Sequence, residues 1–306
     1  SASFVPNEPL LYARPDVFSH GTHTAGIIAA AENRFGMRGV APEAELILVK
    51  VIRDDDRGEF AWVLKGLVHA VQSGADIITV GLTVPLSQHG FHDTETGRWL
   101  SSASVVELAN AMSRATTYAH LQGATVIAAA GDYARDGGLG TDPDAGYDGD
   151  LIYLPAEADH VLAVSATTPQ GWATEQAGAS FDAPTRYSNY GESMVALSAP
   201  GGDVVYAGDE LCEVGPVVHD CFVFDLVLST GSDWEPGYAS YFWAGGTGAA
   251  AAYVSGVAAL IIGANGGDLK PALVEEALRG SADDLGRPGL DNFYGYGRVN
   301  AGAYFR

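Results

Sequence analysis

The sequence predicts an α/β fold, a doubly wound parallel sheet with helices on both faces. Short apolar runs rich in Val and Ile alternate along the chain with longer runs whose apolar residues recur at helical spacing. Nearly continuous apolar strands are typical of parallel sheets, because helices cover such sheets on both faces. Ligands bind beyond the carboxyl ends of the strands in these sheets, so functional residues are expected there.

Four runs are predicted to be strands and two to be helices. The strands are predicted at residues 44–51, 75–82, 124–130 and 160–166, and the helices at residues 60–73 and 104–121. Residues 137–150 are rich in Gly and Asp and are expected to form a loop. Residues 203–243 are aromatic and are expected to form a hairpin-like insertion. No repeat or linker divides the sequence, so residues 1–306 are predicted to form one domain.

The composition argues against some classes of partner. The chain has 306 residues and a net charge of −22. Clustered Lys and Arg bind phosphate backbones, so nucleic acid is not an expected partner. The longest apolar run, Val254–Ala264, is shorter than the roughly 18 residues that cross a bilayer, and no membrane span is expected. The acidity indicates a solvated acidic surface, with adaptation to high salt or binding of divalent cations as alternatives.

The two cysteines, Cys212 and Cys221, lie close together in the predicted insertion. A local pair fits a small disulfide loop in an oxidising compartment, and two free buried thiols are the alternative. The chain has no signal sequence with a basic start and an apolar middle, but a mature secreted protein would lack one too. We expect an extracellular protein.

Residues 19–26 read SHGTHTAG and form the sharpest motif of the chain. Two histidines three residues apart could suggest a metal pair, but the glutamate of the zinc-protease HExxH motif is missing. The string instead resembles the HGTHxAG motif of the subtilisin-like serine proteases, the subtilase family. The resemblance implies that His20 begins a helix and acts as the general base.

Further stretches resemble subtilase signatures in the order that the family has them. They are GVAP at 39–42, ADII at 75–78, AAGD at 129–132, YSNYG at 187–191, APG at 199–201, GGTGAAAAYVSG at 245–256 and YGYGRVNA at 294–301. The resemblance covers nearly the whole chain. It implies a subtilisin-like fold, a peptide or protein as substrate or ligand, and no required cofactor.

The residues at the active-site positions depart from the family pattern. Gly248 matches the nucleophilic serine, and glycine has no side chain that could attack a carbonyl. Asp132 matches the asparagine whose amide donates to the oxyanion, whereas an ionised carboxylate only accepts hydrogen bonds. The nineteen residues before His20 contain no D-[ST]-G motif, and Glu8 and Asp16 are their only acids. We therefore expect that the first strand, with the triad aspartate, has been removed or belongs to a missing N-terminal segment or prodomain; Asp16 as the partner of His20 is the alternative.

Two hydroxyl side chains lie near Gly248 in the sequence. Thr247 is adjacent but is expected to point elsewhere on the turn, and Ser255 lies two turns along the predicted helix, in the interior. Neither is expected to replace the missing nucleophile.

The resemblance also implies which segments bind the substrate backbone. These are Gly81, Leu82, Ala129, Ala130 and Gly131. Gly81 and Thr83 replace the Ser and Gly of the family's MSLG stretch. Since the backbone can still pair, peptide binding is expected to survive the loss of chemistry.

A calcium site is a weaker prediction. Asp142, Asp144, Asp148 and Asp150 cluster in a Gly-containing stretch, and Ca²⁺ prefers several carboxylate oxygens. Their spacing is not that of an EF-hand, and a solvated acidic loop is the alternative. We expect at most a structural Ca²⁺ there.

Three functions fit the sequence. The first is a subtilase homologue that is catalytically inactive. The second is an active extracellular serine endopeptidase whose sequence is incomplete or misassigned at the site. The third is a module that binds peptides without cleaving them, and it is compatible with the first. A hydroxyl side chain at position 248 together with an upstream D-[ST]-G motif would decide for the second.

Overall fold

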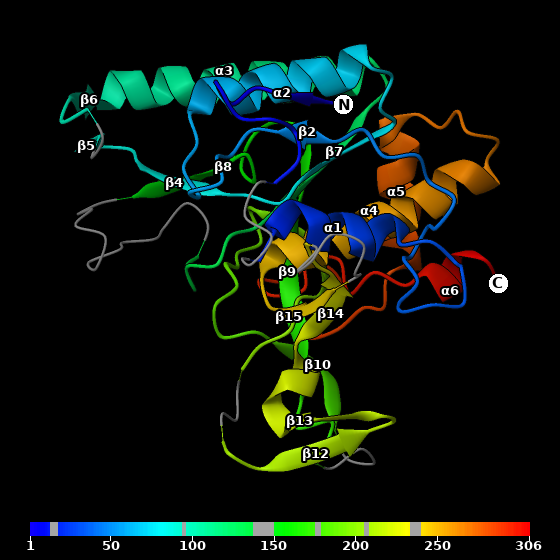
Figure 1. Ribbon diagram of the computed structural model, residues 1–306. Coiled ribbons are helices and arrows are strands. Elements are labelled where there is room, and N and C mark those ends of the chain that lie inside the picture. The colour runs from blue at the N-terminus through cyan, green and yellow to red at the C-terminus, as the bar shows by residue number, and fades with distance from the viewer. Residues whose placement is uncertain (13–17, 94–95, 137–149, 175–178, 205–207, 233–239) are drawn as a thin grey trace.

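The computed structural model describes residues 1–12, 18–93, 96–136, 150–174, 179–204, 208–232 and 240–306. Its centre is a parallel sheet (Figure 1). The parallel strands, in spatial order, are β3 (Ile77–Val80), β7 (Thr125–Ala129), β9 (Val161–Gln170) and β11 (Val195–Pro200). Strand β10 (Ser180–Pro184) pairs antiparallel with the far end of β9 and extends the sheet. The predicted fold class is confirmed.

Helices cover both faces of the sheet (Figure 1). One face packs against α2 (Phe60–Gln72) and α3 (Ser102–Leu121), and the other against α4 (Thr247–Ala264) and α5 (Pro271–Ser281). Successive side chains of a strand point to opposite faces. Val126 accordingly belongs to the α2–α3 core, while its neighbour Ile127 belongs to the α4–α5 core. The two helices predicted from spacing are confirmed.

The predicted strand at residues 44–51 is much shorter in the structure. Only β2 (Val49–Lys50) forms, and it pairs in parallel with β1 (Ala2–Ser3). Leu46 and Leu48 are partly exposed, so the apolar residues before β2 lie at the surface instead of inside a sheet. Strand β1 is thus a short first strand of the chain, although no D-[ST]-G motif follows it.

The segment at residues 203–243 contains two hairpins. One joins β12 (Leu211–Val214) to β13 (Val217–Asp220), and the other joins β14 (Val227–Thr230) to β15 (Tyr241–Ala244). The 3-10 helix η1 (Cys221–Asp225) lies between them, and Cys212 and Cys221 form a disulfide. The first hairpin projects from the molecule, whereas β14 packs against α1 (His20–Ala29).

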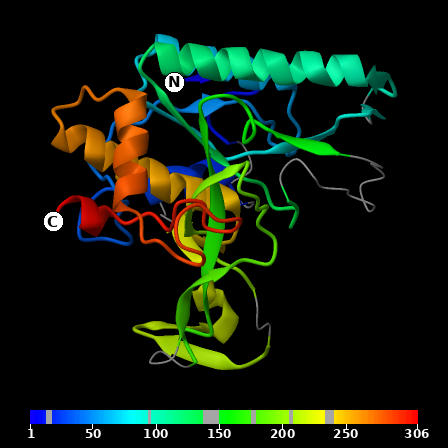
Figure 2. The same ribbon diagram turned by 180° about the vertical axis from the view of Figure 1, so that it is seen from behind.

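The remaining elements are small. They are the pair β4 (Val84–Ser87) with β8 (Leu151–Leu154), the pair β5 (Gly90–His92) with β6 (Trp99–Ser101), and the helix α6 (Ala301–Tyr304). Figure 2 shows the chain from behind, with α6 beside α5. Within the described residues, α4 is the one helix long and apolar enough to cross a membrane, and 72% of it is buried inside the protein.

Candidate active site

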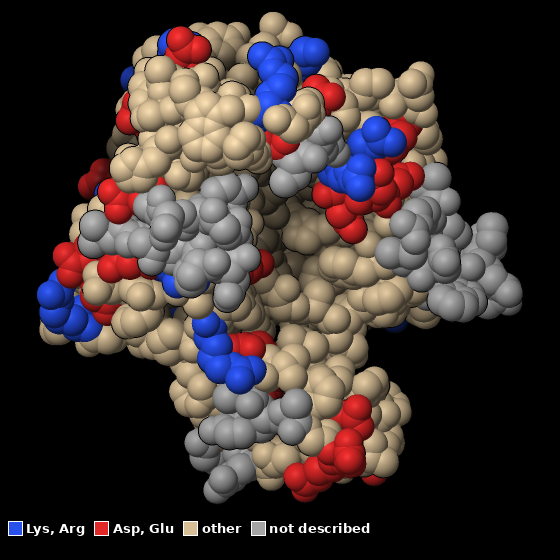
Figure 3. Space-filling model, turned by 90° about the vertical axis from the view of Figure 1, so that its left-hand side faces the viewer, with Lys and Arg blue, Asp and Glu red and all other residues tan. Residues whose placement is uncertain are grey.

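The predicted catalytic positions come from four elements that meet at one edge of the sheet. Helices α1 and α4 both begin there, and β3 and β7 both end there. Figure 3 views the molecule from the side on which these helices begin, and it shows a hollow near the middle of that face. The location agrees with the rule that sites lie beyond the carboxyl ends of parallel strands.

His20 is the first residue of α1. The preceding residue, Ser19, caps the helix: its hydroxyl accepts from the Thr22 amide and lies 2.8 Å from the Thr22 hydroxyl. Gly26 lets the helix approach β14 closely, since a β-carbon there would lie 2.1 Å from Oγ1 of Thr230. The N-terminus of α1, and with it His20, is thereby held against a neighbouring hairpin.

The imidazole of His20 lies between two glycines. A β-carbon at Gly248 would lie 2.8 Å from Nε2, and a β-carbon at Gly81 would lie 3.0 Å from Cε1. The first distance is shorter than β-carbons keep in proteins. Position 248 therefore faces Nε2 of the histidine, as a serine nucleophile would, but a side chain at 248 would require the ring to move.

Asp132 follows β7 and caps the N-terminus of α4. Its Oδ1 accepts a hydrogen bond from the backbone N–H of Thr247 at 2.9 Å and from the Thr247 hydroxyl at 2.7 Å. The same hydroxyl accepts from the Gly131 N–H at 3.0 Å. A carboxylate at a helix N-terminus is favoured by the helix dipole. Asp132 is thus a structural acceptor that adds negative charge beside His20.

The charge state of His20 follows from its surroundings. The ring keeps contact with solvent, yet the surrounding protein atoms desolvate it, and this desolvation lowers its pKa below the usual value. The negative charges of Asp132 and Asp56 act in the opposite direction and are the smaller effects.

No carboxylate is hydrogen-bonded to the His20 ring in the part of the chain that the structure describes. Glu8 is engaged elsewhere: it lies 3.0 Å from Nζ of Lys50 and accepts from the Asp54 amide at 2.9 Å. Asp16, the other acid before His20, lies outside the described residues.

The predicted substrate-binding segments flank the site. Gly81 and Leu82 follow β3, Ala129 ends β7, and Ala130 and Gly131 follow it. The structure thus brings them together with His20, Asp132 and Gly248.

Two residues that the sequence analysis did not assign to the site tie these segments together. The Thr83 hydroxyl donates to the Ala129 carbonyl at 2.6 Å, and the Asn189 amide donates to the Ala130 carbonyl at 2.9 Å. Asn189 lies in the YSNYG signature and Thr83 in the stretch that resembles MSLG, but neither motif indicated these hydrogen bonds. The strand ends are therefore cross-linked by side chains.

Comparison with known proteins identifies the family. The sequence profile of the Subtilase family matches residues 7–297. The chain belongs to the subtilase family. Subtilisin E of Bacillus subtilis (strain 168) is 40% identical over 108 residues, which cover 35% of this chain and 28% of that protein. The thermophilic serine proteinase of Bacillus sp. (strain AK1) is 25% identical over 299 residues, which cover 97% of this chain and 54% of that protein.

A solved structure agrees. The crystal structure of a lanthipeptide protease is 26% identical and has a TM-score of 0.65, covering 93% of this chain and 74% of that one. The matches to the two curated relatives span between about a quarter and about half of the relatives' lengths. This subtilase thus shares the family's fold and signatures, while its own site carries the substitutions described above.

The predicted calcium residues are only partly described. Asp142, Asp144 and Asp148 lie outside the described residues, and Asp150 is exposed, with its carbonyl accepting from the Gln88 amide. Within the described part of this subtilase, no three His, Cys, Asp or Glu residues are grouped so that they could hold a metal ion. His23, the second histidine of the motif, is buried with Nε2 3.1 Å from the Val227 carbonyl.

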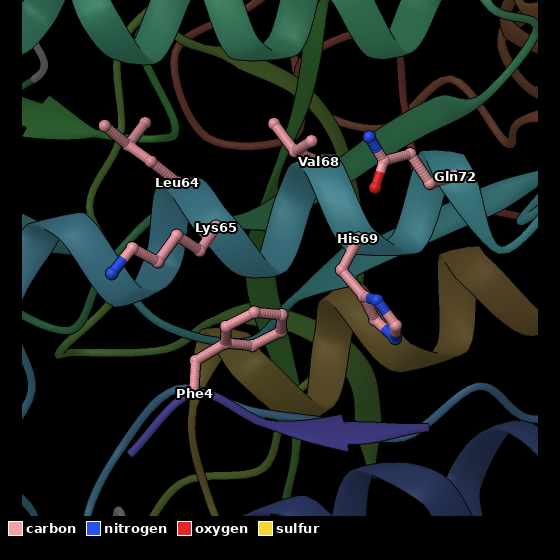
Figure 4. A pocket seen from close by; sticks show the side chains of 6 residues that line it. All are labelled: Phe4, Leu64, Lys65, Val68, His69 and Gln72. Carbon is pink, nitrogen blue, oxygen red and sulfur yellow. The ribbon is translucent and has the colours of Figure 1, made fainter. Parts of the chain in front are cut away.

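A pocket of about 390 Å³ lies elsewhere on the surface, where β1 meets α2 (Figure 4). It is lined by Phe4, Leu64, Lys65, Val68, His69 and Gln72. The rings of Phe4 and His69 meet edge to face at 5.4 Å. None of the active-site positions lines this pocket, so it has no part in the chemistry discussed below.

Proposed function

We propose that this subtilase binds an extended peptide or protein segment at the site but does not cleave it. One observation carries the proposal: position 248, opposite Nε2 of His20, is a glycine. The general base therefore has no hydroxyl to activate at this position, where the covalent step of serine-protease chemistry needs its nucleophile.

Neither neighbouring hydroxyl is free to take over this role. Oγ1 of Thr247 donates to Asp132 and accepts from the Gly131 amide, so it is held away from His20. Oγ of Ser255 is buried; it donates to the Ala251 carbonyl and accepts from Thr79, both at 2.8 Å. These contacts support the absence of an alternative nucleophile.

Asp132 opposes the transition state as well. A tetrahedral intermediate carries an oxyanion, and Asp132 places a charge of the same sign beside it. Loss of a single oxyanion donor lowers the rate on the order of 10²–10³-fold, a figure measured on a subtilisin rather than obtained from this structure. The Thr247 amide at the start of α4 is bound to Oδ1 of Asp132.

Peptide binding is supported by the backbone that remains at the strand ends. Residues 81–82 follow β3, and Gly81 has no side chain that could cover the backbone there. An extended ligand can add to such an edge through main-chain hydrogen bonds, which do not depend on the missing serine. Family membership supports a peptide or protein as the ligand. Since disulfides persist in oxidising environments, the Cys212–Cys221 bond supports an extracellular location.

The proposal is tested with a fluorophosphonate probe, casein and hydrogen exchange. Intact mass spectrometry should show no probe adduct, and casein should stay intact under conditions in which subtilisin E degrades it. Unfolded casein should instead slow amide exchange at residues 81–83 and 129–132. His20→Ala is the matched control and should change neither the labelling by the probe nor the cleavage of casein. An adduct together with sustained cleavage that His20→Ala abolishes would overturn the proposal.

A further inference from the structure

The hairpin of β12 and β13 projects from the molecule and belongs to no larger sheet of the described residues. Figures 1 and 2 show it at the end of the molecule remote from α2 and α3. An isolated two-stranded hairpin is marginally stable in water. The disulfide between Cys212 and Cys221 fixes this one to the start of η1. We call residues 211–220 the arm.

One face of the arm combines apolar and acidic side chains. Leu211 pairs with Asp220 and Glu213 pairs with Val218, so these four side chains share a face. Leu211 is 67% exposed and Val218 is 61% exposed. Exposed apolar residues beside polar ones are a feature of surfaces that bind partners.

The charged residues of the arm and of the sequence next to it are acidic. No Lys or Arg occurs between Arg186 and Lys270, whereas Asp209 and Glu210 directly precede the arm. Figure 3 shows red acidic side chains gathered at the projecting end. Lysines on sheet edges discourage pairing with other strands, and this hairpin has none. Like charges oppose pairing with a second copy, so the charge favours a basic partner.

The backbone of the arm offers free edges. The Cys221 amide donates to the Glu210 carbonyl at 2.9 Å, which fixes the alternation of bonded and non-bonded pairs along the hairpin. By that alternation Glu213 and Val218 form a non-bonded pair, and their N–H and C=O groups point outward from the two strands. Each edge can therefore receive an added strand.

We propose that the arm binds an extended, basic segment of a partner protein by strand addition. Main-chain hydrogen bonds form along one edge. Basic side chains of the partner lie near Glu213 and Asp220, and its apolar side chains pack on Leu211 and Val218. The inference is independent of the function proposed for the site.

The test uses a labelled peptide of roughly ten residues in which every second position is Lys or Val in turn and the positions between are Ser, so that Lys and Val lie on one face of the added strand. Its affinity is measured by fluorescence anisotropy at about 150 mM salt, where long-range attraction is screened. The double variant Leu211→Ser with Val218→Ser should weaken binding at least about tenfold, since it removes the central apolar contacts. Glu213→Gln should weaken it about threefold, because a partly exposed charge pair is weak.

Matched controls separate strand addition from attraction to an acidic protein. Val106→Ser and Glu107→Gln alter exposed residues of α3 and should leave the affinity unchanged. A peptide with proline at its central Val positions should not bind, because proline removes the donors that a strand needs. Amide exchange should slow at residue 213 or at residue 218, whichever lies on the edge that the peptide joins, when the peptide without proline binds.

Several results would overturn the proposal. These are equal losses of affinity in the arm variants and the control variants, equal affinity of the peptides with and without proline, or no binding at about 1 mM peptide. A dimer of the free chain that the double variant abolishes would assign the arm to self-association and would also refute a basic partner. Melting temperatures of all variants show whether they remain folded.

Discussion

Restoring a serine at position 248 is the most direct perturbation of the site. The β-carbon of Gly248→Ser would lie 2.8 Å from Nε2 of His20 and 3.0 Å from the Gly81 carbonyl oxygen, whereas ordinary contacts begin at 3.4 Å. The imidazole must therefore recede by about half an ångström. Overpacking of this kind costs about 1–3 kcal/mol, and better helix propensity returns about 0.5 kcal/mol.

The expected net loss is about 0.5–2.5 kcal/mol of unfolding free energy. It should lower the melting temperature by about 2–4 °C per kcal/mol. Gly263→Ser is the matched control, because it lies in the same helix and a β-carbon there meets nothing within 4 Å. The control should be neutral or slightly stabilising.

The new serine should also fail to restore a protease. Asp132 remains an acceptor beside the oxyanion, a defect on the order of 10²–10³-fold. Among the described residues no carboxylate is bonded to His20 to fix its tautomer, and loss of that carboxylate's charge in a serine-protease triad lowers kcat by about 10⁴-fold. Casein cleavage and fluorophosphonate labelling of Gly248→Ser measure this directly. Rapid labelling with cleavage comparable to subtilisin E, or a raised melting temperature, would refute the packing argument.

Three further predictions concern pH, the strand ends and the arm. Desolvation lowers the pKa of His20 and His23 in the folded state, so the unfolded chain takes up protons first as the pH falls. The unfolding free energy should therefore fall as the pH drops below about 6.5. Melting temperatures between pH 5 and 8 test this, and a melting temperature that rises with acidification would contradict it. Thr83→Val removes the hydrogen bond to the Ala129 carbonyl and should lower the unfolding free energy, measured with denaturant, by about 1 kcal/mol. An unchanged unfolding free energy would contradict this prediction and would mean that water replaces the bond. Opening the disulfide by Cys212→Ser with Cys221→Ser frees a short loop and should lower local stability by about 2–3 kcal/mol, seen as faster amide exchange in the arm but not in α3.

The fold was largely predictable because its signals are local. Residues 126–129 are apolar and, with Thr125, form a strand buried on both faces, as such a run predicts. The helix at residues 60–72 follows from the spacing of its apolar residues. The strand predicted at 44–51 was mostly wrong, because an apolar run shows where a strand could form but not whether neighbours are there to pair with it.

The sequence could predict that certain residues lie together, but not their contacts. Motif order placed His20, Asp132 and Gly248 together, and the structure brings all three to one edge of the sheet. The position of the imidazole between Gly81 and Gly248 depends on distances between three separate segments. The bond from Thr83 to Ala129 is also set by such a distance, and no motif carries it.

The substitutions at the site are physically connected. Gly248 leaves space that His20 occupies, and Gly81 leaves space on the other side of the same ring. Asp132 is unfavourable beside an oxyanion, but as a cap on α4 it gains about 0.3–1 kcal/mol from the helix dipole. Each change therefore fits the inactive, peptide-binding site proposed above. Loss of the nucleophile alone would not explain why glycine stands at position 81 and aspartate at position 132.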